Sequence, residues 1–342
     1  MKRILSYPIF VGWDLTYRCN LSCVHCMFGY SKAAQQEEMD TASICKTRKD
    51  FAENKVVSVQ FAGGEPLLRN DIETIVKCAT DFGMVTTIAT NGLLCDKTIS
   101  SLLKKVHINS VQISLDGLER EHELIRGKGT FMKVVNGIKN IINEGIPVSV
   151  AVLVNKANYL QIDSIINYLT HLGVNAVRLQ FLLLAGKARD HKNVLYVEPT
   201  LIREAVQMAE NNAYVKQGRI QLILPCYYPK HSDDRFIVND FSNSSFLVNS
   251  CGAGTTSVNI DPYGNVTACG ILTDERWFLG NLNKSSMKDI WMNSEGLLCW
   301  RSNDPPEACE SCEIYSKCMG GCRANAWLLE GSFLEKDPYC WR

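Results

Sequence analysis

Short apolar runs alternate with longer amphipathic segments along the first half of the chain. The apolar runs are rich in β-branched and aromatic residues, which is typical of buried strands. They occupy residues 9–16, 56–66, 83–92, 109–117, 146–155 and 175–184. Between them, apolar residues recur every three or four positions, which predicts helices, most clearly over residues 69–83, 129–145 and 159–173. Each of these three predicted helices ends in a glycine, as many helices do.

Six strand–helix units in series predict an α/β fold. Strands joined in this way run parallel through right-handed crossovers, and near-continuous apolar strands fit a sheet that is covered on both faces. Either an open doubly wound sheet or a barrel-like sheet satisfies the pattern, and in both the chemistry collects at the carboxyl ends of the strands. Four distinctive stretches stand at such ends, and they read "CNLSCVHC", "GGEP", "TNG" and "SLDG".

The regular alternation fades after about residue 190. A helix is expected over residues 196–212 and an irregular connection over residues 226–246. The final segment is rich in cysteines and turns but has few periodic stretches, and such a region often needs a metal to specify its fold. The sequence therefore predicts three parts: a core over residues 1–190, a connecting region over 191–249 and a small cysteine-rich domain over 250–342.

The charge and cysteine composition narrows the class of protein. Among the 342 residues, 36 basic side chains balance 36 acidic ones, so no net field favours nucleic acid or a membrane surface. No stretch approaches the roughly 20 apolar residues of a membrane span, and the first residues do not form an export signal. We therefore expect a cytoplasmic protein with no nucleic-acid or membrane partner. Its 15 cysteines are clustered, and in a reducing compartment clustered thiols more often bind metals than form disulfides.

The first cysteine cluster follows the first predicted strand. Cys19, Cys23 and Cys26 have C-x3-C-x2-C spacing. A structural zinc site with His25 as fourth ligand is one interpretation, although His25 stands directly beside Cys26. Three buried free thiols are a second interpretation. The third is an iron–sulfur cluster held by three thiolates, which leaves one iron open to a cofactor or substrate.

Taken together, "CNLSCVHC" after one strand, "GGEP" after the next and six strand–helix units resemble the radical S-adenosylmethionine (SAM) superfamily. The resemblance implies a partial (β/α)6 barrel core with a 4Fe-4S cluster on Cys19, Cys23 and Cys26. In that family the open iron chelates the amino and carboxylate groups of SAM. An electron entering the sulfonium cleaves SAM, and the resulting 5′-deoxyadenosyl radical removes a hydrogen atom from a C–H bond of the substrate.

The resemblance also implies which residues contact SAM. The GGEP turn is expected beside the methionine group of SAM, and the SLDG stretch near its ribose or carboxylate. An arginine is expected to pair with the SAM carboxylate through its planar guanidinium group. The residues concerned are Gly63, Gly64, Glu65, Pro66, Asn91, Ser114, Asp116 and Arg126. Adenine contacts are expected at the ends of the fifth and sixth strands, near Val154 and Gln180.

For several of these residues the sequence leaves an ordinary structural role open. The two glycines also suit a simple turn, and Glu65 suits a solvated turn position. Asp116 could cap the following helix, and Asn91 could supply a left-handed turn. Arg126 could be a surface arginine on a helix.

Seven cysteines of the final segment form a second pattern. They are Cys251, Cys269, Cys309, Cys312, Cys318, Cys322 and Cys340. A two-site zinc module is one interpretation. Beside a radical SAM core, however, the spacing resembles a SPASM domain, which carries two auxiliary iron–sulfur clusters. The resemblance assigns the first auxiliary cluster to Cys251, Cys269 and Cys322, and the second to Cys309, Cys312, Cys318 and Cys340.

The first auxiliary set lacks a fourth protein ligand in this pattern. Cys226 is the nearby upstream thiol, and it is an inert thiol, the missing ligand, or a hydrogen-atom donor to a substrate radical. The remaining cysteines have no partner at metal-binding spacing, and we expect them to be separate thiols. They are Cys45, Cys78, Cys95 and Cys299.

The sequence therefore predicts a radical SAM/SPASM enzyme that uses SAM and three 4Fe-4S clusters, with electrons from a reductase or a flavodoxin-type donor. Relatives with this domain mostly modify ribosomally made peptides by crosslinks, thioethers, epimerisation or oxidation. We expect a peptide substrate here as well, with a separate peptide-recognition protein as a candidate partner. The alternative is a small-molecule substrate, through epimerisation or dehydrogenation of an aminoglycoside or sugar, or oxidation of a tetrapyrrole side chain.

Overall fold

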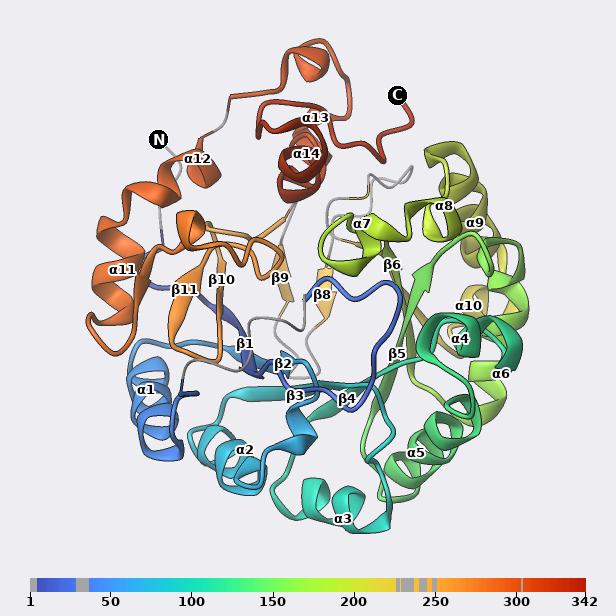
Figure 1. Ribbon diagram of the computed structural model, residues 1–342, viewed down its shortest axis with the longest axis horizontal. Helices are drawn as coiled ribbons and strands as arrows, with labels where there is room; N and C mark the ends of the chain where they lie inside the picture. The colour runs from blue at the N-terminus through green and yellow to red at the C-terminus, as the bar shows by residue number, and fades with distance from the viewer. Residues whose placement is uncertain are drawn as a thin grey trace.

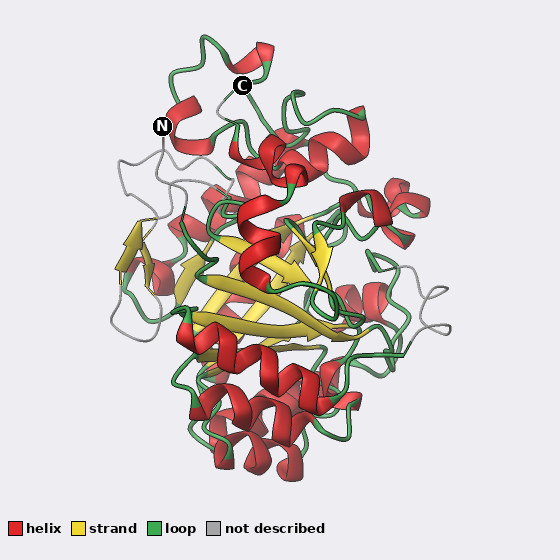
Figure 2. Ribbon diagram, turned by 90° about the vertical axis from the view of Figure 1, so that its left-hand side faces the viewer, coloured by secondary structure: helices red, strands yellow, loops and turns green. Residues whose placement is uncertain are grey.

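The computed structural model describes residues 5–28, 37–225, 228, 237–239, 245–247, 251–302 and 304–342. Its main feature is a 10-stranded sheet with the order β12-β11-β10-β1-β2-β3-β4-β5-β6-β7. The sheet curves around the centre of the molecule, and helices surround it (Figure 1). Seen from the side, the strands cross the middle of the molecule, with a layer of helices below them and the end of the chain at the top (Figure 2). The predicted α/β fold with a partial barrel is confirmed.

Each of the six predicted strands is present, and each runs parallel to the next in chain order. The strands are β1 (Phe10–Thr16), β2 (Ser58–Gly63), β3 (Val85–Thr90), β4 (Ser110–Ser114), β5 (Val148–Val154) and β6 (Ala176–Phe181). A short seventh strand, β7 (Gln221–Ile223), pairs parallel with β6 and was not predicted. Three residues are too few for a visible alternation of apolar and polar side chains.

Helices connect these strands and bury apolar side chains against the sheet. The three clearest predicted helices correspond to α2, α5 and α6, and the predicted helix over residues 196–212 corresponds to α9. The helices up to residue 225 are α1 (Thr41–Glu53), α2 (Ile72–Asp81), α3 (Lys97–Lys105), α4 (Glu119–Arg126), α5 (Phe131–Asn143), α6 (Ile162–Leu172), α7 (Lys187–Asp190), α8 (Lys192–Leu195), α9 (Pro199–Asn211) and α10 (Ala213–Lys216). Two 3-10 turns accompany them, η2 (Pro66–Leu68) and η3 (Tyr159–Gln161). Helix α6 ends at Gly173, whose left-handed backbone (φ +86°) satisfies the sequence prediction.

The cysteine-rich end of the chain continues the barrel sheet. Strand β10 (Ser257–Ile260) pairs parallel with β1, so that Phe10 lies opposite Ser257. Strands β11 (Asn265–Thr267) and β12 (Gly280–Asn281) then extend the sheet in antiparallel fashion. Short helices complete this part: η4 (Glu275–Trp277), α11 (Met287–Asn293), η5 (Glu295–Leu297), α12 (Leu298–Arg301), η6 (Glu307–Cys309), α13 (Tyr315–Cys318) and α14 (Arg323–Glu330). A separate antiparallel pair joins β8 (Ile237–Asn239) to β9 (Ser245–Leu247).

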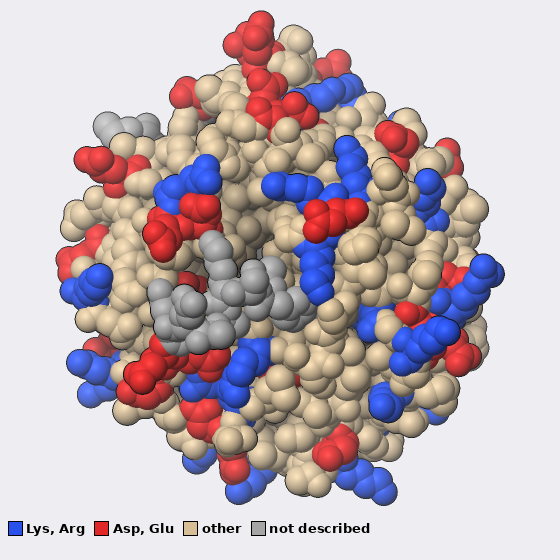
Figure 3. All heavy atoms as spheres, viewed as in Figure 1, with Lys and Arg blue, Asp and Glu red and all other residues tan. Residues whose placement is uncertain are grey.

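Acidic and basic side chains are interspersed over the face drawn in Figure 3, as the balanced composition predicts. No helix among the described residues is long and apolar enough to cross a membrane.

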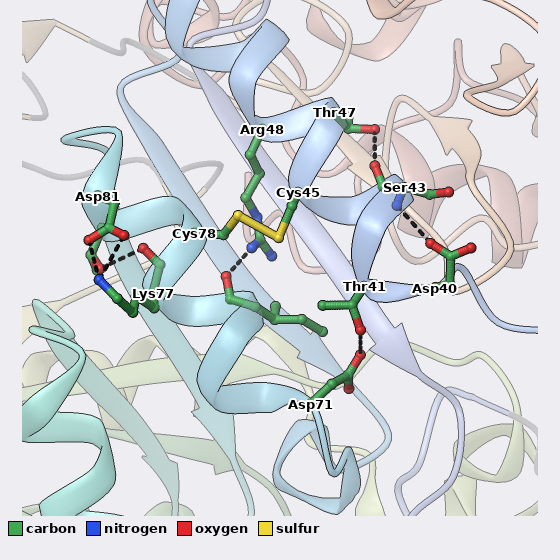
Figure 4. Close-up of a disulfide and its surroundings, with 12 residues drawn as sticks. Asp40, Thr41, Ser43, Cys45, Thr47, Arg48, Asp71, Lys77, Cys78 and Asp81 are labelled. Carbon is green, nitrogen blue, oxygen red and sulfur yellow. Dashed lines mark hydrogen bonds and ion pairs between the residues drawn. A yellow bond between two sulfur atoms is a disulfide. The ribbon is translucent and has the colours of Figure 1, made fainter.

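Two of the four cysteines expected to be separate thiols are instead paired with each other. Cys45 of α1 and Cys78 of α2 form a disulfide between these neighbouring helices (Figure 4). The expectation was wrong because 33 residues separate the two cysteines, and only the packing of α1 on α2 brings them together. Below the disulfide, the buried Arg48 donates a hydrogen bond to the Ile75 carbonyl oxygen. Cys95 and Cys299 form no disulfide with any residue that the structure describes.

Candidate functional site

A cavity of about 440 Å³ opens at the carboxyl ends of the barrel strands. Most residues predicted to contact the first cluster or SAM line it. They are Cys19, Cys23, Cys26, Gly63, Gly64, Asn91, Ser114, Arg126 and Gln180. These residues come from the ends of β1 to β4 and β6 and from α4, so the barrel brings together parts of the chain that are far apart in sequence.

The three-cysteine loop is held in place from two sides. On one side, the Val24 N–H donates to the Ile125 carbonyl oxygen at the end of α4 (3.1 Å). On the other, the Lys187 N–H donates to the Cys26 carbonyl oxygen (2.9 Å), and Lys187 Nζ donates to Ser22 Oγ (2.6 Å). These contacts fix the path of the loop against α4 and the segment after β6. Sequence reasoning missed Lys187, because no local pattern links it to Ser22, which lies 165 residues earlier.

Gly186 is a second residue that the sequence did not reveal. Its φ of +53° lies in the left-handed region, and a Cβ there would stand 2.5 Å from the Met27 carbonyl oxygen and 2.7 Å from that of Cys26. Only a glycine lets this backbone pass so close to the cysteine loop. The one signal in the sequence is the glycine in "LLLAGKAR", directly after the sixth predicted strand.

The Gly-Gly pair brings the end of β2 against the cysteine loop. A Cβ on Gly63 would lie 2.3 Å from the Thr16 carbonyl oxygen, and one on Gly64 would lie 2.3 Å from that of Arg18. The Gly64 N–H donates to the Thr16 carbonyl oxygen (2.7 Å), and the Glu65 N–H to that of Arg18 (2.8 Å). The pair therefore does more than an ordinary turn, because it makes close backbone approach possible.

Glu65 lies behind the cavity rather than in it. Its carboxylate is fully buried and accepts hydrogen bonds from the N–H groups of Leu67 (3.0 Å) and Asn91 (2.8 Å) and from Thr90 Oγ1 (2.9 Å). Burial raises the pKa of Glu65 in spite of these donors. The solvated-turn interpretation is wrong. Both carboxylate oxygens of Glu65 already accept hydrogen bonds, so the ammonium group of SAM would donate to neighbouring carbonyl oxygens instead. Glu65 orients Asn91. Pro66, the first residue of η2, is buried and also does not line the cavity.

Asn91 connects the third strand to the cysteine loop. Its Nδ2 donates to Asn20 Oδ1 (2.7 Å) and lies 3.8 Å from Cys19 Sγ. The left-handed conformation suggested for Asn91 belongs to the next residue, Gly92, with φ +83°. The correction follows from steric freedom, because glycine adopts this conformation at less cost than asparagine.

Asp116 and Arg126 form a buried ion pair at the edge of the cavity. Arg126 Nε donates to Asp116 Oδ2 (2.6 Å), while Asp116 Oδ1 accepts from the Leu153 N–H (2.9 Å). Asp116 does not cap α4, whose N-cap residue is Leu118, and Arg126 is not a surface residue, with only 10% of its side chain exposed. Burial opposes ionisation of both groups. The charge of Arg126 nevertheless keeps the pKa of Asp116 below its ordinary value, and Asp116 keeps that of Arg126 above.

Arg126 also faces the cysteine loop. Its Nη1 lies 4.0 Å from Cys23 Sγ, and its Nη2 lies 3.4 Å from His25 Nε2. Burial, and to a smaller extent the charge of Arg126, lower the pKa of His25 to about 4. His25 Nε2 therefore faces a cation, which disfavours it as a ligand of a positively charged zinc ion.

The loop thiols suit a cationic cluster. Burial raises the pKa of Cys19 and, to about 11, that of Cys23. Cys19 and Cys26 raise the pKa of Cys23 further, because neighbouring thiolates repel one another. Cys23 is buried, whereas Cys19 and Cys26 are partly exposed. If all three thiols ionise, a positively charged group between them offsets their repulsion, and iron supplies such a group.

The assignment of the seven later cysteines to two cluster sets stays a prediction. Cys309, Cys312, Cys318 and Cys340 line a second, smaller cavity. The members of the other set, Cys251, Cys269 and Cys322, also influence one another, since burial and then neighbouring thiols raise the pKa of Cys269 to about 12. Here too, mutually repelling buried thiols fit a metal cluster. Cys226 lies outside the described residues, so its role as inert thiol, fourth ligand or hydrogen donor stays a prediction.

Other residues of the cavity were not singled out by the sequence. Arg178 and Phe181 of β6 line it, and Phe181 also lines the smaller cavity of the four later cysteines. Leu153 lines it where Val154 was expected, because Val154 is buried and points to the other face of β5.

Comparison with protein families gives two matches on this chain. Residues 13–169 match the model of the radical SAM superfamily. Residues 251–313 match that of an iron–sulfur cluster-binding domain, SPASM. The two matches contain the cysteine loop and the first part of the later cysteine pattern.

Three curated relatives match nearly the whole chain. Mycofactocin maturase MftC of Mycolicibacterium smegmatis is 30% identical over 99% of this chain and 84% of its own length. AdoMet-dependent heme synthase of Methanosarcina barkeri is 28% identical over 99% and 98%. PqqA peptide cyclase of Gluconobacter oxydans is 27% identical over 98% and 91%.

A solved structure shares the fold. The structure of Streptococcus suis SuiB bound to S-adenosylmethionine superposes with a TM-score of 0.79 at 20% identity, covering 99% of this chain and 78% of SuiB. At that identity the likeness concerns the arrangement of the chain alone.

Proposed function

The chain belongs to the radical SAM superfamily, and on this premise we propose that Cys19, Cys23 and Cys26 hold the 4Fe-4S cluster to which SAM binds. It is an enzyme that uses iron–sulfur clusters and SAM. The observation that carries the assignment is the cavity at the barrel mouth, where the three thiols meet Gly63, Gly64 and the other residues expected around SAM.

When bound, the cluster supplies the electron that cleaves SAM, and the radical so formed takes a hydrogen atom from the substrate. The chain's own residues prepare the site for this reaction. Gly63 and Gly64 let the end of β2 approach the backbone of the cysteine loop, and they would offer backbone carbonyls to the ammonium group of the methionine part of SAM. Asn91, fixed by Glu65, steadies the loop beside Cys19. Arg126 is held by Asp116 through its Nε, and its two Nη groups, which face Cys23 and His25, would be the donors to a carboxylate. Ser114 and Gln180 contribute polar groups from β4 and β6.

We assign two further 4Fe-4S clusters to the end of the chain, which makes three in all. The first auxiliary cluster would use Cys251, Cys269 and Cys322. The second would use Cys309, Cys312, Cys318 and Cys340. Residues 250–342 would then be the auxiliary-cluster domain, residues 1–190 the SAM-binding core and residues 191–249 their connection. Because such clusters need reduced thiols and an electron source, we place the enzyme in the cytoplasm with a reductase or flavodoxin-type donor.

Anaerobic reconstitution tests this assignment. We expect iron and sulfide sufficient for three clusters per chain, and cleavage of SAM to 5′-deoxyadenosine after reduction. Replacing Cys19, Cys23 and Cys26 with Ala should abolish cleavage and leave two clusters. Colourless, zinc-loaded protein that cannot cleave SAM would refute the proposal, and retained cleavage in the triple variant would refute the assignment of the three cysteines.

The substrate we propose is a ribosomally made peptide, modified by a crosslink, thioether, epimerisation or oxidation. This rests on the relatives, of which one is named a peptide cyclase and another a maturase, over nearly the full chain. A separate peptide-recognition protein would be a partner in that case. Incubation with a precursor peptide deuterated at candidate carbons should transfer deuterium into 5′-deoxyadenosine.

A small-molecule substrate is the second candidate. The relative that supports it is the heme synthase, which this chain matches over 98% of that enzyme's length. The same deuterium assay separates the candidates. Transfer from a deuterated tetrapyrrole, and none from any precursor peptide, would favour the second.

A further inference from the structure

Asp337 is hydrogen bonded to the chain at both auxiliary sets of cysteines. Its Oδ2 accepts from the Cys322 N–H (2.6 Å), and its Oδ1 accepts from the Tyr339 N–H (2.9 Å). Its backbone carbonyl oxygen accepts from the Cys340 N–H (2.8 Å). Cys322 belongs to the first auxiliary set and Cys340 to the second, so this one residue connects them.

The residues around Asp337 pack closely against its side chain. The residue is only 3% exposed and lines the small cavity of Cys309, Cys312, Cys318 and Cys340. Gly321, directly before Cys322, has φ +83°, and a Cβ on it would lie 2.4 Å from the Cβ of Asp337. The chain can pass this carboxylate only because position 321 is a glycine.

Asn325 is a side-chain neighbour of the same carboxylate. It lies on the first turn of α14 and is only 1% exposed. The Asp337 carboxylate therefore also faces the helix that begins directly after Cys322.

We propose that Asp337 is a positioning residue for both auxiliary clusters: it fixes Cys322 relative to Cys340 and lowers the reduction potential of the cluster that Cys322 helps to hold. The proposal rests on the proposed function, since it presupposes those clusters. Hydrogen bonds to cluster sulfurs and local charge set such potentials. Asp337 takes up two N–H groups that could otherwise face the sulfurs, and it adds negative charge in a place with little water. Both effects oppose the one-electron reduction of the cluster.

The test uses the full chain with Cys19, Cys23 and Cys26 replaced by Ala, so that only the auxiliary clusters contribute iron, sulfide and a redox signal. In this parent, D337N removes the charge and turns one acceptor into a donor at nearly constant size. D261N is the matched control. Asp261 is 7% exposed and likewise accepts two backbone N–H groups, from Tyr263 (2.9 Å) and Asn265 (2.8 Å), but it belongs to neither cysteine set. Iron and sulfide content and a redox titration followed by electron paramagnetic resonance are measured for all three proteins.

We expect D337N to raise the reduction potential of one auxiliary cluster by at least about 59 mV, which is a tenfold change in the equilibrium constant of a one-electron couple. The potentials of D261N should equal those of the parent. If D337N fails to assemble an auxiliary cluster and loses iron while D261N keeps its full iron content, the positioning role is also supported. A fully loaded D337N with unchanged potentials overturns the inference alone. Equal loss of iron from D337N and D261N also overturns it, because the effect is then general. A parent without iron would overturn the proposed function itself.

Discussion

Arg126 has the most demanding environment of any residue in the candidate site. It is buried between Asp116, His25 and Cys23, and its charge is what keeps Asp116 ionised in the interior. Replacing Arg126 with Gln would leave that carboxylate buried without an opposite charge, and removing one partner of a buried pair is strongly destabilising. We expect the free energy of unfolding to fall by about 3 kcal/mol, measured by urea denaturation of the cluster-free chain at pH 7.

A matched control stands on the same helix. Arg120 is exposed on α4, so Arg120→Gln should change the free energy of unfolding by less than about 0.5 kcal/mol. Equal losses in the two variants would mean that the pair with Asp116 is not what stabilises the chain.

At the residue scale, the sequence predicts best where function dictates residue type. One cavity is lined by many of the residues that the sequence singled out, namely Cys19, Cys23, Cys26, Gly63, Gly64, Asn91, Ser114 and Arg126. The sequence predicts poorly where a role depends on a contact across the fold. The buried position of Glu65 behind Asn91 depends on the meeting of β2 and β3, and the Cys45–Cys78 disulfide depends on the packing of two helices.

At the scale of elements, the turn between β6 and α7 supports the cysteine loop. Gly186 has a left-handed backbone and stands against the carbonyls of Met27 and Cys26. In Gly186→Ala the added Cβ would push the loop away, so we expect the chain to retain less than half of the iron of the first cluster and to lose SAM cleavage in proportion. Iron content is compared in a background where the seven auxiliary cysteines are replaced.

Gly83 separates this effect from simple backbone strain. It has a similar left-handed φ of +75°, but a Cβ there meets no atom within 4 Å. Gly83→Ala should therefore show only the strain, about 1 kcal/mol of stability, with full iron loading. Full iron loading in Gly186→Ala would contradict the supporting role.

The elements themselves were largely predictable, because β1 to β6 and the helices between them follow strong local patterns of apolar residues. Two of the strands that were not predicted are β7 and β10, which have only three and four residues and are too short for a distinct pattern. Their strand conformation comes from pairing with β6 and β1 rather than from their own sequence.

On the scale of the whole molecule, the cysteine-rich end is part of the barrel. Strand β10 covers the edge of β1, and two contacts close to the start of the chain strengthen the junction. The Ile9 N–H donates to the Thr256 carbonyl oxygen (2.9 Å), and Trp291 Nε1 donates to the Leu5 carbonyl oxygen (2.7 Å). The sequence did not predict this junction, because sequence patterns do not show which strand pairs with which.

Removing residues 251–342 should therefore destabilise the core as well as delete two cluster sites. The truncation uncovers β1, and an exposed sheet edge with apolar neighbours promotes association between chains. We expect the shortened chain to aggregate or to elute as oligomers in size-exclusion chromatography. The full-length chain with Cys309, Cys312, Cys318 and Cys340 replaced by Ala keeps β10 and should remain soluble. A monomeric truncated chain that unfolds at the temperature of the full-length chain would show that the core is independent of the segment after residue 250.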